Sequence, residues 1–157
     1  MTSLKRMGLS WKQRQPISEA CLVLPLDPVP ASRPRVTRWG AYYGKRYTEF
    51  RKRGNEILAN LSTLVLSPSN ADLFPLYGVL EVTAIFNVVK PRTSKLSIPR
   101  GDVDNYFKTL DICNGIVWGD DQQIKVLHAI KRFNDVGSIE LRIKEIKDGD
   151  NLSLPQA

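Results

Sequence analysis

A cluster of acids within a basic chain is the feature that most constrains how this protein can fold. The segment from residue 100 to residue 121 holds five of the sixteen acidic residues: Asp102, Asp104, Asp111, Asp120 and Asp121. Carboxylates gathered in one place repel one another unless a cation neutralises them. Mg²⁺ prefers carboxylate oxygens and keeps water and phosphate oxygens as its other ligands. The segment therefore predicts a divalent-metal site, provided that the fold brings these acids together.

The middle of the acidic segment has the pattern of a helix. Tyr106, Leu110 and Cys113 recur at helical spacing. Asn114-Gly115 is typical of a helix end, because glycine readily adopts the left-handed conformation found there. A helix of about ten residues is only about 15 Å long. The chain must turn after it, and this turn could bring the later acids back to the earlier ones.

Asp102 and Asp104 share one side of the chain only if the backbone between them is extended, so we expect the helix to begin at or after Asp104. With Asp121 and Lys108 they form the set that phosphodiester hydrolysis requires. Carboxylates fix a metal that activates water, and a cation stabilises the developing negative charge. A structural alternative stays open, in which Asp104 caps the helix and pairs with Lys108 while Asp120 and Asp121 are turn residues.

The rest of the chain is basic, and its net charge of +7 favours a polyanionic partner such as nucleic acid. Residues 32–53, on a Pro- and Gly-rich loop and the helix after it, carry eight positive charges against one negative, with Trp39 and three tyrosines among them. Basic groups contact phosphates and aromatic rings stack on unpaired bases, although a solvated helix face is the alternative. A second basic loop spans residues 90–101. The predicted DNA-binding residues are Arg33, Arg35, Arg38, Lys45, Arg46 and Arg100.

Alternation of apolar and polar residues predicts an α/β (α+β) fold, in which two main helices pack on a small mixed β-sheet. Pro25 either places the first strand at a sheet edge or marks its end. The expected elements are strands at 20–26, 78–89, 122–133 and 138–146, a helix at 48–66 with Thr48 as its N-cap, and a hairpin turn at 134–137. The expected domains are a flexible basic arm at 1–19, a folded domain at 20–147 and a disordered tail at 148–157.

Cysteine usage and hydropathy suggest a cytoplasmic protein. Cys21 and Cys113 each lie among apolar residues, and we expect both to be reduced and buried. No apolar run approaches 18 residues and the N-terminus lacks a signal-peptide pattern, so neither a membrane span nor export is expected. Glu81 and His128 lie on expected strands and are interpreted as structural residues, although Glu81 could join a metal site.

Three motifs follow one another along the chain. They are Pro28-x-Pro30-x-Ser32-Arg33-Pro34-Arg35 after the first strand, Asp102-Val103-Asp104-Asn105 followed by Lys108, and Asn114-Gly115-Ile116-Val117-Trp118 leading to Asp120-Asp121. Over residues 20–146 this order resembles the RusA family of Holliday junction resolvases, many of which are encoded by phages or prophages. The N-terminal arm and the long loop at 90–101 depart from the family pattern, which leaves the substrate preference open.

The resemblance implies a homodimer of small mixed α/β subunits that uses Mg²⁺ or Mn²⁺ and cuts two opposed strands of a four-way DNA junction. By the same resemblance, Asp102, Asp104 and Asp121 correspond to the catalytic, metal-binding carboxylates. Lys108 corresponds to the functional lysine, and Asp120 to a less critical neighbour. A dimer with two-fold symmetry suits this substrate, because a four-way junction offers two equivalent strands to cut.

The sequence therefore predicts a Mg²⁺-dependent, structure-specific endodeoxyribonuclease that resolves Holliday junctions and related branched DNA. The alternative is a non-catalytic, structure-specific DNA-binding protein on the same scaffold, which would need no Mg²⁺ and would leave the strands intact. A third class, an RNA-binding adaptor, is disfavoured because nothing in the chain resembles an RNA-recognition motif.

Overall fold

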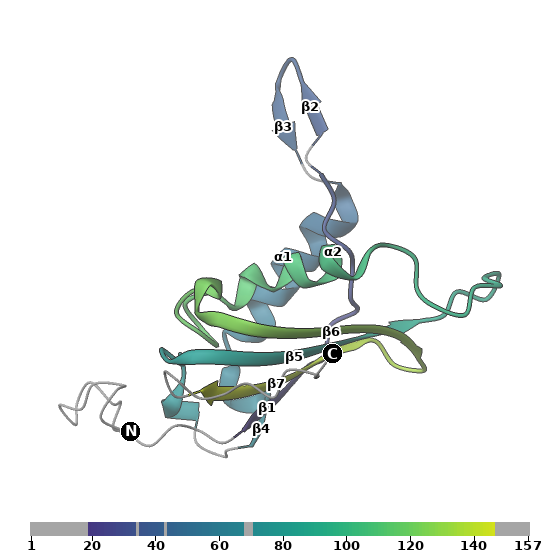
Figure 1. Cartoon of the computed structure of the whole chain (residues 1–157). Helices are drawn as coiled ribbons and strands as arrows, with labels where there is room; N and C mark the ends of the chain where they lie inside the picture. The colour runs from purple at the N-terminus through teal and green to yellow at the C-terminus, as the bar shows by residue number, and fades with distance from the viewer. Residues whose placement is uncertain (1–18, 34, 43, 68–70, 147–157) are drawn as a thin grey trace, which may run out of the picture.

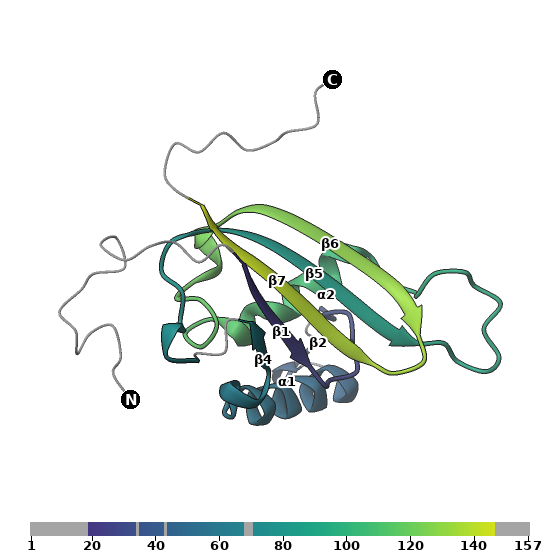
Figure 2. The same cartoon turned by 90° about the horizontal axis from the view of Figure 1, so that it is seen from below.

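The computed structural model describes residues 19–33, 35–42, 44–67 and 71–146. Its main layer is a five-stranded sheet in the order β4-β1-β7-β5-β6, and helices α1 (Lys45–Leu58) and α2 (Val103–Lys108) lie on one side of it (Figures 1 and 2). The strands are β1 (Ala20–Leu24), β4 (Val65–Ser67), β5 (Val79–Val89), β6 (Ile124–Asn134) and β7 (Ser138–Ile146). The predicted α+β fold, a small mixed sheet with two helices, is confirmed.

Alternation along β5 builds the core between the sheet and the helices. Leu80, Val82, Ala84 and Phe86 are each 0% exposed, and the Phe86 ring lies 5.6 Å from the Tyr106 ring of α2. Full burial of a side chain such as Leu80, Val82 or Phe86 contributes about 1.5–3 kcal/mol. The period of two therefore decides which face of the sheet meets the helices. Their buried partners on β7 are Ile139, Leu141 and Ile143.

The parallel pairing of β5 with β6 determines where the acidic segment lies. From the end of β5 the chain passes through the loop 90–101, α2, the 3₁₀ helix η3 (Thr109–Cys113) and residues 114–123. It then starts β6 with Ile124 opposite Leu80. A parallel neighbour requires such a crossover, because the chain must return from the end of β5 to the opposite end of the sheet, where β5 began. The acidic segment is therefore the crossover connection between the two strands.

The first helix differs from the prediction of 48–66 at both ends. It begins at Lys45 with Gly44 as N-cap, and the Thr48 hydroxyl donates to the Gly44 carbonyl from within the first turns. It ends at Leu58, because Asn60 leaves helical geometry (φ −111°, ψ 53°). Residues 61–63 form a 3₁₀ turn, and the last predicted helical residues belong to β4. Apolar residues at 57, 61 and 64 fit one continuous helix, but they fit equally well a helix that ends at Leu58 and is followed by a 3₁₀ turn. The spacing alone therefore could not locate the end of the helix.

Strand neighbours differ from expectation in two places. β1 lies between β4 and β7, so it is not an edge strand, and Pro25 marks its end. Residues 134–137 connect β6 to β7, but β5 lies between these strands, so the predicted hairpin is wrong. Local turn chemistry locates a turn but does not select the partner of each strand.

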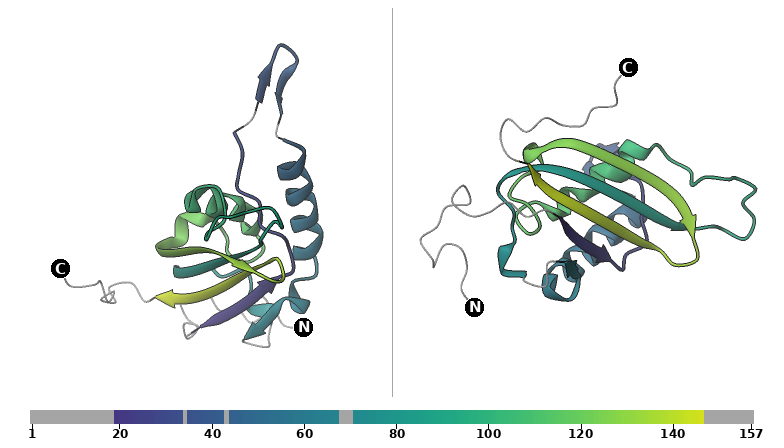
Figure 3. Two further views of the ribbon diagram at one scale, coloured as in Figure 1. Left: turned by 90° about the vertical axis from the view of Figure 1, so that its right-hand side faces the viewer. Right: turned by 60° about the horizontal axis from the view of Figure 1, so that its bottom comes forward.

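A second, two-stranded sheet stands away from the body of the domain. β2 (Arg35–Thr37) and β3 (Gly40–Tyr42) pair as a hairpin that projects beyond the start of α1 (Figures 1 and 3). At its turn Trp39 is 84% exposed, and the guanidinium carbon of Arg38 lies 4.9 Å from the centre of a Trp39 ring. The sequence predicted only a loop here, because strands of three residues show no clear period.

The remaining general predictions have mixed outcomes. Both cysteines are free thiols as expected; Cys113 is buried, whereas Cys21 is only half-buried. None of the described helices is long and apolar enough to cross a bilayer. Apart from Glu19, the predicted arm at 1–19 lies outside the described residues, as does the predicted tail at 148–157.

Candidate active site

Asp102 and Asp104 lie at the beginning of α2. Asp102 is the N-cap, its backbone is extended (φ −74°, ψ 143°), and its side chain makes no capping hydrogen bond. The helix begins at Val103, one residue earlier than predicted, so that Asp104 lies in its first turn. Both aspartates are exposed, and their carboxylate oxygens are open to a ligand.

Lys108 is connected to this carboxylate pair. Its ammonium lies 3.4 Å from an oxygen of Asp104, and it also donates to Oδ1 of Asn105 at 3.3 Å. The Asp104–Lys108 pair is 66% and 62% exposed, so it contributes only about 0.3–0.5 kcal/mol to stability. The pairing part of the structural alternative is therefore observed, but Asp104 is not the helix cap. A contribution to stability this small does not by itself explain the presence of Asp104 and Lys108 at these positions.

The chain immediately before Asp102 is fixed by two side chains. The Tyr106 hydroxyl donates to the carbonyl of Arg100 at 2.6 Å, and burial raises the pKa of Tyr106, which keeps this hydroxyl protonated. The Lys131 ammonium donates to the carbonyl of Pro99 at 2.8 Å and to that of the residue just before Asp102. Sequence reasoning missed Lys131, because a lysine on a strand normally points to solvent.

Lys131→Met is expected to loosen the peptide before Asp102. A hydrogen bond to a charged group contributes about 1.5–3 kcal/mol, so we expect a loss of about 2 kcal/mol in the free energy of unfolding, measured in urea. Lys125→Met is the matched control, because Lys125 is an exposed lysine of the same strand. Equal unfolding free energies for the two variants would show that the Lys131 contacts do not hold this peptide.

At the other end of the crossover, a capping box presents Asp121. Asp120 is the N-cap of the 3₁₀ helix η4 (Asp121–Gln123), and its carboxylate accepts a hydrogen bond from the Gln122 N–H at 2.9 Å. The Gln123 side chain accepts from the Asp120 N–H at 2.8 Å. The turn predicted at 120–121 is confirmed, and it leaves Asp121 exposed directly before β6.

The pKa values of the two neighbouring carboxyl groups are shifted in opposite directions. The hydrogen bond from the Gln122 N–H lowers the pKa of Asp120. The pKa of Asp121 is raised, first by its hydrogen bond with the Asp120 carboxyl, then by partial burial and by the charges of Asp120 and Asp111. A cation bound beside Asp121 would favour its ionised form and so counteract this rise in its pKa.

Asp120→Ser is expected to lower the pKa of Asp121 in the metal-free protein. Serine removes the neighbouring charge and carboxyl, yet its hydroxyl can still accept the Gln122 N–H and cap η4. The measurement is an NMR titration of the side-chain carboxyls in the presence of a chelator. In the wild type, Asp121 should titrate above an ordinary aspartate at about pH 3.9. An Asp121 midpoint that is unchanged by the substitution contradicts the assigned cause.

A small depression brings the two ends of the crossover together. It has a volume of about 130 Å³. Two members of the predicted catalytic set, Lys108 and Asp121, line it. Asp111 lines it too, although sequence reasoning did not assign it to the site. The Arg51 guanidinium of α1 donates to both carboxylate oxygens of Asp111, at 2.7 and 2.9 Å. The only sequence signal for Asp111 was its place in the acidic segment, since its partner lies sixty positions away.

Asp102 and Asp104 do not line this depression. Within the described part of the chain, no three His, Cys, Asp or Glu side chains are grouped closely enough to hold a metal ion. The donor chemistry nevertheless fits Mg²⁺, because the candidate ligands Asp102, Asp104 and Asp121 offer only exposed carboxylate oxygens. Mg²⁺ commonly takes one or two protein carboxylates and completes its shell with water and substrate phosphates.

The predicted DNA-binding residues fall into two groups. Arg100 lies on the loop 90–101, two positions before Asp102. The first turn of α1 contains no acid, so the positive end of the helix dipole adds to the charge of the basic residues there. The residues of this second group lie just before the hairpin, within it and in the first turn of α1. They are Arg33, Arg35, Arg38, Lys45 and Arg46.

Glu81 and His128 lie together on the helix-free side of the sheet. Nε2 of His128 is 3.3 Å from Oε1 of Glu81, and both line a separate depression with Thr83 and Arg142. Because the register pairs Thr83 with His128 and Arg142, these side chains share the face opposite the core. Glu81 is therefore not part of the carboxylate group on α2.

These observations first define a class. Carboxylates and a lysine on a crossover connection, flanked by a basic hairpin and helix, are the groups of a small α+β protein that acts on nucleic acid. The family follows from the sequence: residues 25–144 match the family model of the endodeoxyribonuclease RusA. This range takes in the complete crossover and every strand of the main sheet except β1 and the last two residues of β7. The chain belongs to the RusA endodeoxyribonuclease family. No curated protein sequence matches it with significance.

Proposed function

We propose that the protein is a Mg²⁺-dependent, structure-specific endodeoxyribonuclease that resolves Holliday junctions and related branched DNA by paired phosphodiester hydrolysis. The observation that carries this proposal is that Lys108 and Asp121 line one depression while Asp104 is paired with the same lysine. Membership of the RusA family supports the reaction class. Mn²⁺ is expected to substitute, because carboxylate oxygens also suit that ion.

Asp102, Asp104 and Asp121 would hold the metal. When bound, Mg²⁺ supplies Lewis-acid neutralisation of the charge that develops on the scissile phosphate. The Lys108 ammonium adds a second positive charge beside that phosphate and orients Asp104. Arg51 pairs with Asp111, which offsets a negative charge that would otherwise repel the DNA.

The basic residues would bind the arms of the branched DNA. Arg33, Arg35, Arg38, Lys45, Arg46 and Arg100 would contact phosphates. The exposed Trp39 at the hairpin turn would stack on bases left unpaired at the branch point. Two subunits related by a two-fold axis would place one site at each of two opposed strands. We propose such a homodimer, acting in the cytoplasm.

A second function is favoured by specific observations. Asp120 serves as a helix cap, Asp104 is paired with Lys108, and no preformed group of three ligands exists among the described residues. Each of these observations also suits a structure-specific DNA-binding protein that has no catalytic role. Such a protein would use the same basic surface and would need no metal.

A cleavage assay separates the two functions. An end-labelled four-way junction is incubated with the protein with and without Mg²⁺, beside a linear duplex of the same sequence. Paired, metal-dependent nicks in the junction alone are the expected result. Tight junction binding without nicks, in either Mg²⁺ or Mn²⁺, would establish the binding protein instead.

A further inference from the structure

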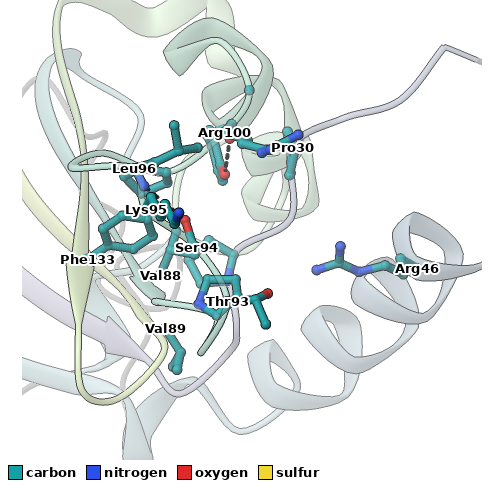
Figure 4. Close-up of a pocket in the computed structure, with 15 residues that line it drawn as sticks. Pro30, Arg46, Val88, Val89, Thr93, Ser94, Lys95, Leu96, Arg100 and Phe133 are labelled. Carbon is teal, nitrogen blue, oxygen red and sulfur yellow. Dashed lines mark hydrogen bonds between the residues drawn. The ribbon is translucent and has the colours of Figure 1, made fainter.

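A large cavity lies beside the candidate active site. It has a volume of about 660 Å³ and lies between the segment 28–30, the start of α1, the loop 90–101 and the end of β6 (Figure 4). Its apolar wall includes Pro30, Val88, Leu96 and Phe133. This volume is within the range of about 300–1,000 Å³ that is usual for small-ligand sites.

The charged residues of this cavity are all cations. Arg46, Lys95 and Arg100 line it and no acid does. None of the three makes an ion pair with a residue that the structure describes. In Figure 4 the Arg46 side chain extends from α1 toward the opening. A fourth cation, Lys90, has its ammonium 5.6 Å from the centre of the Phe133 ring. Three cations with no ion pair among the described residues, placed around an apolar cavity, favour a ligand that is both anionic and apolar.

A nucleotide of DNA has this combination, because its phosphate is anionic and its base has two apolar faces. In a duplex both faces are covered by neighbouring bases, so only an unpaired nucleotide can place its base in a concave site. The cavity adjoins the candidate active site, since Gly101 lines it and Asp102 follows. The Tyr106 hydroxyl donates to the Arg100 carbonyl, and this hydrogen bond holds in place the backbone that lies between the cavity and Asp102.

We propose that this cavity binds one unpaired nucleotide of the DNA strand that passes the candidate active site. The apolar wall takes the base, and Arg46, Lys95 and Arg100 take the flanking phosphates. The proposal rests on the proposed function in taking DNA as the ligand, but it requires neither cleavage nor a metal. It would give the protein a direct means of recognising a branch point, where continuous stacking is interrupted and a base is more easily unpaired.

The test compares two variants of the same loop. Leu96→Glu places a carboxylate in the cavity, whereas Ile98→Glu makes the same charge change at a residue that is 56% exposed and does not line it. Binding to fluorescein-labelled dT10 and to a fully paired ten-base-pair duplex is measured by anisotropy, with chelator present. We expect Leu96→Glu to bind dT10 about tenfold more weakly than Ile98→Glu does, while the two variants bind the duplex equally.

Three outcomes would overturn the proposal. The two variants could bind dT10 with equal affinity, or Leu96→Glu could weaken duplex binding, relative to Ile98→Glu, as much as it weakens dT10 binding. The third is that the wild type shows no measurable binding of dT10. Leu96 is itself 39% exposed, and unfolding midpoints identify any loss of fold. If Leu96→Glu does not fold, the same comparison is made between Leu96→Ser and Ile98→Ser. Because no metal is present, the result is independent of the cleavage assay. Selective binding of dT10 by a protein that leaves junctions uncut would support the nucleotide site and contradict the proposed nuclease function.

Discussion

Asp104→Asn is expected to abolish junction cleavage while junction binding persists or tightens. The amide has nearly the shape of the carboxylate but no charge, so Lys108 and the proposed metal would both lose an anionic partner. Loss of one preorganised electrostatic group in an active site typically lowers the rate about 10²–10³-fold, and a metal ligand belongs at the upper end of that range. Binding should not suffer, because one negative charge fewer faces the DNA phosphates.

The structure makes this experiment interpretable, because Asp104 contributes little to folding. Its pair with Lys108 is more than half exposed, and exposed pairs contribute at most about 1 kcal/mol. Asp135→Asn is the matched control, since it makes the same chemical change at an exposed turn position between β6 and β7. Cleavage is measured as single-turnover rates on the junction, with binding measured without metal. Full cleavage by the Asp104→Asn protein, or loss of binding together with the fold, would remove Asp104 from the metal-ligand set.

Local patterns in the sequence were sufficient for the core of this fold. In β5 apolar and polar residues alternate from Leu80 to Thr83, and in β7 they alternate from Ile139 to Lys144. The predicted inward residues Leu80, Val82 and Leu141 are all buried. The pairing order was not predictable in the same way. β6 joins β5 in parallel, and β7 lies on the other side of β5, which depends on contacts between residues far apart in the sequence. Short strands such as β4 and those of the hairpin carry too few residues to show a period.

The same distinction applies to the candidate site. The relation of Asp104 to Lys108 is local, one helical turn, and spacing alone predicted their contact. The meeting of Lys108 with Asp121 depends on how the crossover returns to the sheet, and only the general argument that the chain must turn anticipated it. The Arg51–Asp111 pair and the bonds from Lys131 join different elements across the domain, so no local pattern could reveal them.

Trp118→Ala is expected to have the largest effect on stability of any single substitution considered. Trp118 is 0% exposed and is the largest fully buried side chain among the described residues. Its Nε1 donates to Oδ1 of Asn114 at 2.7 Å, inside the turn that leads to Asp121. Truncation of a buried tryptophan costs about 3–5 kcal/mol. That loss is a large part of the total free energy of unfolding of an ordinary domain, about 5–15 kcal/mol.

Trp39→Ala supplies the control, because it makes the same truncation at a side chain that is 84% exposed. Substitutions at exposed positions usually change stability by no more than about 0.5 kcal/mol. Urea unfolding should therefore be displaced strongly by Trp118→Ala and hardly at all by Trp39→Ala, whereas junction affinity should fall with Trp39→Ala. Equal stabilities for the two variants would mean that the Trp118 turn is not packed as described. The support for Asp121 in the candidate site would then be lost with it, because the same turn positions that carboxylate.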